Sequence, residues 1–105
     1  MITAKFTRTA ERFASAAISG HAGYADSGQD IVCAAVTSAV QLTANAITEV
    51  VKAPADVRVL ENLISIQLPA GFSLEESRFL QALHLQLSLL AEDYPGTIQV
   101  IVSEV

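Results

Sequence analysis

Two side chains that can carry out nucleophilic chemistry lie close together in the first third of the chain. Cys33 is the only cysteine of the sequence, and His21 is one of its two histidines. Both belong to the stretch GHAGYADSGQDIVCAAV, which covers residues 20–36. A cysteine thiolate is a strong nucleophile, and a neighbouring imidazole can stabilise it and then pass a proton to a leaving group. This pair predicts a nucleophile and a base joined by a bendable segment.

The segment between the two residues is a glycine-rich loop. Gly20, Gly23 and Gly28 can each adopt backbone angles that are closed to other residues. We expect this loop to bend sharply and to move.

A helix is predicted over residues 31–51, with Asp30 as its N-cap. Cys33 would then lie in the first turn, where the helix dipole favours a thiolate by roughly 0.3–1 kcal/mol and unpaired N–H groups can bind an oxyanion. That energy is too small to ionise the thiol alone, so His21 is needed. A carboxylate at Asp30 acts against the thiolate, orients His21 or only caps the helix, and the sequence leaves these roles open.

The helical wheel decides which way the thiol points. Cys33 lies one turn before Thr37, so it falls at the border of a polar stripe and not in the middle of the apolar side. The stripe consists of Thr37, Gln41, Asn45, Thr48 and Lys52. The apolar side consists of Val32, Val36, Ala39, Val40, Ile47 and Val50.

The remaining elements surround this helix. A capping box from Ser73 to Glu76 introduces a second, leucine-rich helix. If the second strand keeps a period of two, one of its faces carries Phe13, Ser15, Ala17, Ser19 and His21. Strands are expected at residues 2–6, 12–19, 57–60, 63–68 and 97–102, with hairpin connections at 8–11 and 61–62 and the second helix at 74–92. The order β-β-α-β-β-α-β predicts an α+β fold in one domain over residues 1–105, with two helices packed on a mainly antiparallel sheet.

Composition limits the function classes. A chain of 105 residues has room for one modest core, and its net charge of −5 argues against direct nucleic-acid binding and suits a basic peptide. A single cysteine fits a reducing compartment, and we see neither a signal peptide nor an apolar run that would span a membrane. We therefore expect a cytoplasmic protein that binds no membrane. Neither a phosphate-binding glycine motif nor a clustered metal site is present, so no cofactor and no metal are expected.

Ordinary structural roles compete with these assignments. A lone cysteine flanked by alanine and valine is usually a small buried hydrophobe, and a histidine at a strand end is usually a surface residue. His84, in the second helix, is expected to face solvent or a partner. A redox-sensing role for Cys33 is less attractive, because no second cysteine is present to resolve a sulfenic acid.

The stretch over residues 20–36 nevertheless resembles the signature of a known family. Its Gly-His pair, glycine-bearing loop and Asp-Ile-Val-Cys-Ala-Ala-Val segment are similar to those of the bacterial ribosomal-processing cysteine proteases called Prp. The chain length and element order also fit this family. The resemblance implies that His21 and Cys33 are the catalytic pair, that Gly20 is a hinge and that Asp30 supports them. Thr37 stands where the family usually has serine, and it keeps the hydroxyl.

The resemblance also implies a substrate. Family members remove a short N-terminal extension from a large-subunit ribosomal protein, and they are homodimers. We therefore expect a homodimeric endopeptidase whose partner is that extension. Its glycine-rich loop would close over the bound peptide. Without substrate we expect the loop to be open or disordered, with a loose contact between Cys33 and His21. The alternative is a non-catalytic ribosome-associated module whose loop only grips a peptide. Fast alkylation of Cys33 below neutral pH would distinguish the enzyme from this module.

Overall fold

Five strands and two long helices make up the described part of the chain. A computed structural model describes residues 1–20 and 27–105, and the element order predicted from the sequence is confirmed. The elements are β1 (Ile2–Thr9), β2 (Arg12–Ser19), α1 (Ser27–Asn45) with a short π-helical continuation η1 (Ala46–Val50), β3 (Asp56–Leu60), β4 (Leu63–Gln67), α2 (Leu74–Asp93) and β5 (Ile98–Glu104).

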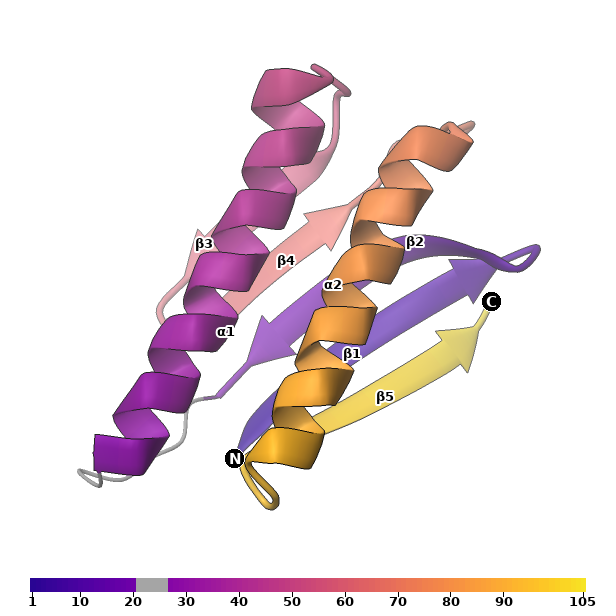
Figure 1. The fold of residues 1–105 in the computed structure, drawn as a ribbon. Coiled ribbons are helices and arrows are strands. Elements are labelled where there is room, and N and C mark those ends of the chain that lie inside the picture. Colours follow the sequence, from indigo (N-terminus) through magenta and orange to yellow (C-terminus); the bar gives the residue numbers. More distant parts are fainter. Residues whose placement is uncertain (21–26) are drawn as a thin grey trace.

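The strands form a single sheet in the order β3-β4-β2-β1-β5. Three of its pairs are antiparallel, and β1 pairs with β5 in parallel. Both helices cover the same face of the sheet and lie side by side across it (Figure 1). The prediction of an α+β fold with a mainly antiparallel sheet is therefore confirmed, and β3 and β5 are its two edges.

A β-bulge in the first hairpin changes the predicted face of β2. Thr7 pairs with Ser15 and Arg8 pairs with Phe13, so Ala14 is an extra residue without an opposite partner. The prediction that Phe13 shares a face with Ser15 is wrong, because the extra residue interrupts the period of two. Phe13 instead turns to the helix side, where its ring lies 5.8 Å from that of Phe6.

Helix α1 begins at Ser27, four residues before the predicted start at residue 31. Gly28 therefore lies within the helix and not in the predicted loop, and Asp30 is not the N-cap. A glycine weakens a helix by about 1 kcal/mol relative to alanine but does not exclude it. As a consequence Cys33 is the seventh residue of the helix, in the second turn and not in the first.

The core is formed between the sheet and the inner sides of the helices. The apolar side predicted for α1 is buried at Val32, Val36 and Val40, and Ile47 extends it into η1. From α2 the core takes Leu80, Leu83, Leu87 and Leu90, and from the sheet it takes mainly Ile2, Ala4, Phe6, Ala16, Ile18, Ile66 and Ile98.

The helical run Ile31–Val50 is long and apolar enough, by length and composition, to cross a membrane. A core helix of a soluble protein passes the same test, and one such helix is weak evidence for a membrane span. Here Val32, Val40 and Ile47 are fully buried against the sheet and α2. The packing of the domain accounts for part of this apolar character, since 33% of the run is buried, while Ile31, Leu42 and Val50 are exposed.

Candidate active site

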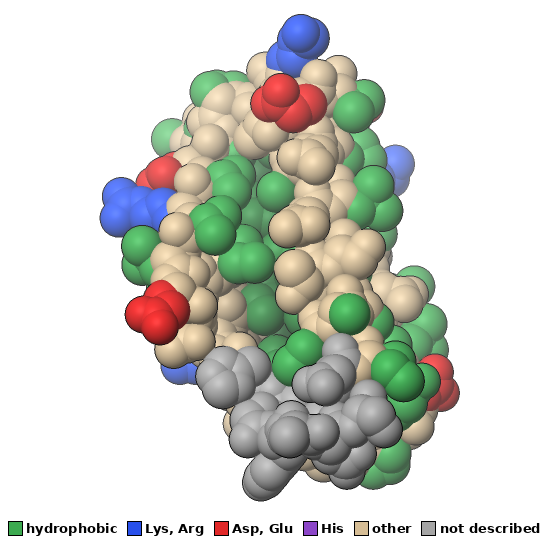
Figure 2. Space-filling model, turned by 90° about the vertical axis from the view of Figure 1, so that its left-hand side faces the viewer, with side chains coloured by type: hydrophobic (Ala, Val, Ile, Leu, Met, Phe, Trp, Pro, Cys, Tyr) green, Lys and Arg blue, Asp and Glu red, His purple; other side chains and the backbone are tan. Residues whose placement is uncertain are grey.

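Cys33 lines a cavity of about 330 Å³ between α1 and the β3–β4 hairpin. Its side chain is half buried and packs against the edge of the core. Figure 2 views this side of the molecule and shows a hollow between two ridges, with hydrophobic side chains gathered on its floor. The lining residues are Ile2, Ile18, Gly20, Cys33, Val36, Thr37, Gln41, Val59, Leu60, Glu61, Asn62, Leu63 and Ile64.

Three of the residues singled out in the sequence meet in this cavity. Gly20 enters from the end of β2, and Cys33 and Thr37 come from successive turns of α1. Their common position confirms the helical wheel, which placed the thiol beside the polar stripe and outside the core. His21 and Gly23 lie outside the described residues, so the pairing of His21 with Cys33 stays a prediction.

Gly20 is fixed at the wall of the cavity by its backbone. It has a φ of +75°, and it donates its N–H to the carbonyl oxygen of Asn62 at 3.0 Å. A Cβ atom at this position would lie 2.8 Å from the carbonyl oxygen of Met1. Both the positive φ and the close approach require glycine. The residue bonded to His21 is thus held in the same cavity as the thiol.

The described lining of the cavity carries little charge. Most of that lining is apolar, and Glu61 is its only charged residue among the described ones. Because Cys33 is the seventh residue of α1, it lies beyond the four unpaired N–H groups of the first turn. The prediction that Cys33 lies in the first turn of the helix is therefore wrong.

The sequence interpretation missed two parts of the cavity. Gln41 lies two turns after Cys33, and its place in the polar stripe was a signal that it would share this cavity. The tip of the β3–β4 hairpin, from Leu60 to Leu63, carried no such signal. It reaches the cavity through strand pairing with β2, which joins residues far apart in the sequence.

No metal centre is formed by the described part of the chain. Within residues 1–20 and 27–105, no group of three His, Cys, Asp or Glu side chains is placed to hold an ion. The chemistry that the described cavity supports is nucleophilic attack by the thiol on a segment lying in the hollow.

Comparison with known proteins assigns the chain to a family. The model of the family described as cysteine protease Prp matches residues 1–99. The chain belongs to the Prp family of cysteine proteases. The family resemblance of the stretch over residues 20–36 is thereby confirmed, and with it the prediction that the protein is an enzyme.

Solved structures agree with the Prp assignment. The chain is similar to the Streptococcus mutans protein SMU.848, with a TM-score of 0.90, 26% identity and coverage of 100% of this chain and 96% of that one. It is also similar to the ribosomal processing protease Prp of Staphylococcus aureus with a covalently linked product peptide, with a TM-score of 0.86, 25% identity and coverage of 97% and 99%. No curated protein matches the sequence.

Proposed function

We propose that this Prp-family protease removes a short N-terminal extension from a large-subunit ribosomal protein, with Cys33 as nucleophile and His21 as general base and acid. The observation that carries the proposal is the position of Cys33, half buried in a hollow whose wall includes Gly20, the residue bonded to His21. Membership in a cysteine protease family weighs against the alternative of a non-catalytic peptide-binding module.

In the proposed reaction the substrate lies in the hollow between α1 and the β3–β4 hairpin. The Cys33 thiolate attacks the scissile carbonyl carbon, the C–N bond breaks, and the His21 imidazolium gives its proton to the leaving amine. A thioester joins Cys33 to the N-terminal fragment. Neutral His21 then takes a proton from water as the water attacks the thioester carbonyl. The C–S bond breaks, and the fragment leaves as a carboxylic acid.

Three observations support this choice of substrate and mechanism. The Staphylococcus aureus relative is named a ribosomal processing protease, and its structure holds a covalently linked product peptide, as expected of a cysteine nucleophile. The part of the hollow that Figure 2 shows is apolar on its floor, which suits an extended segment whose side chains pack downward. The net charge of −5 suits a basic ribosomal protein.

The test is incubation of the purified protein with precursors of large-subunit ribosomal proteins, followed by intact-mass measurement of the products. We expect one precursor to lose a short N-terminal peptide. Cys33→Ala and His21→Ala should each lower the cleavage rate by at least a hundredfold, because each removes a group that bonds to the reacting atoms or transfers their proton.

Ser38→Ala is the matched control for these variants. Ser38 is an exposed residue of α1 that lies outside the lining of the Cys33 cavity, so the variant should cleave at the wild-type rate. Cleavage by Cys33→Ala at a rate near that of Ser38→Ala would refute the proposal. If the protein cleaved none of these precursors but did cleave another peptide, the proposed substrate would be refuted, whereas the role of Cys33 as nucleophile would not be.

We also propose that the protein is a cytoplasmic homodimer. The single cysteine suits a reducing compartment, and exposed apolar side chains such as Leu42 and Val50 offer contact area for a second copy. Light scattering after gel filtration should give twice the mass of the chain. A monomer mass at micromolar concentration would contradict the dimer.

A further inference from the structure

Helix α2 carries a regular stripe of residues on the side that faces away from the sheet. This α2 stripe consists of Arg78, Ala82, Leu85, Leu89 and Glu92, which follow one another at spacings of four, three, four and three residues. All five are exposed, and the fractions for Leu85 and Leu89 are 59% and 44%. The same alternation of spacings occurs in helices that pack lengthwise against another helix. The α2 stripe therefore has the pattern of a helix–helix contact.

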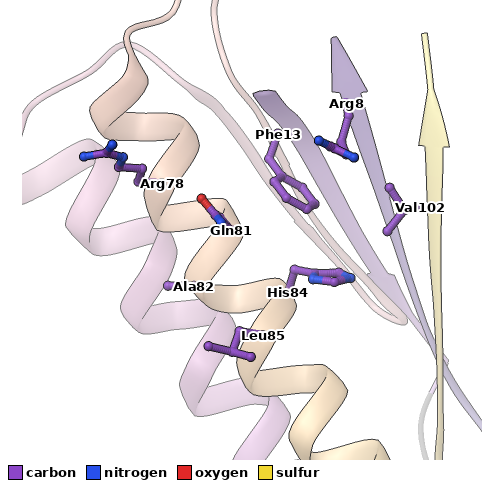
Figure 3. A pocket seen from close by; sticks show the side chains of 8 residues that line it. All are labelled: Arg8, Phe13, Arg78, Gln81, Ala82, His84, Leu85 and Val102. Carbon is purple, nitrogen blue, oxygen red and sulfur yellow. The ribbon is translucent and has the colours of Figure 1, made fainter. Parts of the chain in front are cut away.

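The direction of the α2 stripe is visible in a close view of the helix. Figure 3 shows Arg78 and Leu85 on the side of α2 that faces away from the strands, whereas His84 reaches toward the strands. The centre of the His84 ring lies 5.2 Å from the centres of two phenylalanine rings of the sheet. The expectation that His84 faces solvent or a partner is corrected by these contacts. The side of α2 that is available to a partner is therefore the α2 stripe.

Helix α1 extends this outer surface beside α2. Its side chains Ile31 and Leu42 are 59% and 71% exposed. A groove of about 460 Å³ lies between the two helices, and it opens to solvent because half of its lining residues are exposed. A helix that is apolar on its core side and also on its outer side is normally covered on both. The outer surface of the two helices therefore indicates a partner.

The distribution of charge favours a second copy of the chain over a membrane as this partner. Helices that lie on a membrane surface carry Lys and Arg beside their apolar side, and α1 and α2 together contain a single basic residue, Arg78. Two copies that each have a net charge of −5 repel one another over most of their surface. Residues 31–48 and 79–91 include no Asp, Glu, Lys or Arg, so two copies can meet there without this repulsion.

The α2 stripe is complementary to itself. Arg78 and Glu92 each stand seven residues from Leu85, one before it and one after it. At roughly 1.5 Å per residue they lie about 21 Å apart along α2, which is too far for a pair within one chain. In an antiparallel pair of α2 helices centred on Leu85, Arg78 of each copy faces Glu92 of the other, and Ala82 lies beside Leu89. A contact between identical copies about a twofold axis needs such a pattern.

We propose that two copies of the chain associate through the α2 stripe, with their α2 helices antiparallel and Leu85 at the twofold axis. The inference rests on the homodimer proposed above and adds the surface through which the copies meet. The cavity of Cys33 lies between α1 and the β3–β4 hairpin, and it shares no lining residue with the groove between α1 and α2. Both Cys33 cavities therefore stay open in this dimer.

The test is the dissociation constant of the dimer, measured by analytical ultracentrifugation of the purified full chain. Leu85→Glu should raise this constant by roughly a hundredfold or more, because two carboxylates would meet at the axis without a partner. Val59→Glu is the matched control, since Val59 is 72% exposed but lies on the edge strand β3, and it should leave the dimer unchanged. Dissociation by Val59→Glu and not by Leu85→Glu would place the contact at the sheet edge and overturn the proposal.

An exchange of the two end charges tests the antiparallel pairing, even if Leu85→Glu does not fold. Arg78→Glu and Glu92→Arg should each weaken the dimer about tenfold, because like charges would then face one another. The double variant should return to within about threefold of the wild type, because the opposite charges again face one another. This recovery can arise only between copies, since the two positions lie about 21 Å apart in one chain. Additive weakening in the double variant would overturn the pairing.

Failure of this inference can be told apart from failure of the proposed protease activity. Cleavage of the precursor is measured on the same preparations as the dissociation constant. A wild type that cleaves the precursor but stays monomeric would overturn the inference and leave the protease activity standing. Uptake of such a monomer by vesicles of phosphatidylcholine and phosphatidylglycerol would overturn it in favour of a membrane. A wild type that forms the dimer but cleaves no precursor would support the inference and refute the proposed activity.

Discussion

The backbone N–H of Gly20 bonds to the carbonyl oxygen of Asn62 at 3.0 Å, and this bond joins the end of β2 to the turn between β3 and β4. The two residues are far apart in sequence and face the same cavity as Cys33. The bond therefore fixes one wall of the Cys33 cavity relative to another. It also fixes the point at which the chain continues to His21.

Gly20→Ala should destabilise the protein and impair cleavage. Alanine at a φ of +75° costs roughly 1–2 kcal/mol, and its Cβ would lie 2.8 Å from a backbone oxygen that cannot move without shifting the start of β1. We expect a loss of about 2–3 kcal/mol in the free energy of unfolding by urea. We expect a larger fractional loss in kcat/KM for the precursor, because the shift occurs at the cavity wall.

Gly96→Ala separates the effect of the positive φ from the effect of the close approach to Met1. Gly96 also has a positive φ, of +81°, but a Cβ atom there would meet nothing within 4 Å. This variant should lose only the roughly 1–2 kcal/mol that the backbone angle costs and should keep wild-type cleavage once folded. If Gly20→Ala lost no more unfolding free energy and no more kcat/KM than Gly96→Ala, the close approach to Met1 would contribute neither to stability nor to cleavage.

Ser73→Ala should weaken the start of α2. The predicted capping box is present: Glu76 accepts from the backbone N–H of Ser73 at 2.6 Å and from its hydroxyl. Loss of an N-cap serine costs about 1 kcal/mol in the free energy of unfolding. Glu75→Gln, in the same turn but outside the box, is the control and should change stability much less.

The capping box also predicts how the stability of the protein changes at acidic pH. The Ser73 hydroxyl is the main cause that lowers the pKa of Glu76 below 4.5. A lowered pKa in the folded state means that this contribution to stability is complete above about pH 4.5 and is lost as the pH falls through the folded pKa. Urea unfolding between pH 6 and pH 3 should therefore show a smaller acid-dependent loss in Ser73→Ala than in the wild type. An equal loss of unfolding free energy with falling pH in Ser73→Ala and in the wild type would contradict this account.

His84 gives a second pH dependence, in a higher range. Burial against Phe6 and Phe13 is the main cause that lowers its pKa below 6.5, and Arg8 from β1 adds to it. Protonation therefore favours the unfolded chain, so stability is complete above about pH 6.5 and falls as the pH drops through the folded pKa. The charged group that acts on His84 is Arg8, which pairs with Glu104 from β5.

Arg8→Gln tests the smaller of these two causes. It should raise the pKa of His84 toward 6.5, measured by NMR titration of the ring proton, because one repelling charge is removed while the burial remains. Arg58→Gln, on the far edge strand, should leave the titration unchanged. A His84 titration midpoint that is the same in wild type and Arg8→Gln would show that Arg8 has no influence on the imidazole.

Local patterns in the sequence predicted most of the fold. The element order, the second strand, the β3–β4 turn and the capping box at Ser73 all follow from alternation, helical period and turn residues. The placement of Cys33 beside Thr37 also followed, because a helical wheel depends only on spacing. These features are decided by neighbours in the chain.

The features that the sequence did not predict depend on distant parts of the chain. The bulge at Ala14 becomes visible only when β2 is paired with β1. The start of α1 at Ser27 differs from the prediction because Gly28 and Asp30, which are common at helix boundaries, do not forbid a helical turn. His84 packs against Phe6 and Phe13, which lie far from it in the sequence, so local hydropathy did not predict this contact.

Thr37 provides the last prediction, because it lies on the turn after Cys33 in the same cavity. If its hydroxyl donates to or accepts from the bound peptide, Thr37→Val should lower kcat/KM about two- to tenfold, the effect of one hydrogen bond of about 0.5–1.5 kcal/mol. Thr37→Ser keeps the hydroxyl and should stay within about twofold of wild type by the same reasoning. Thr48→Val is the control, since the Thr48 hydroxyl donates to the carbonyl oxygen of Ala44 and lies outside the cavity. Full activity in Thr37→Val would show that only the shape of this side chain matters.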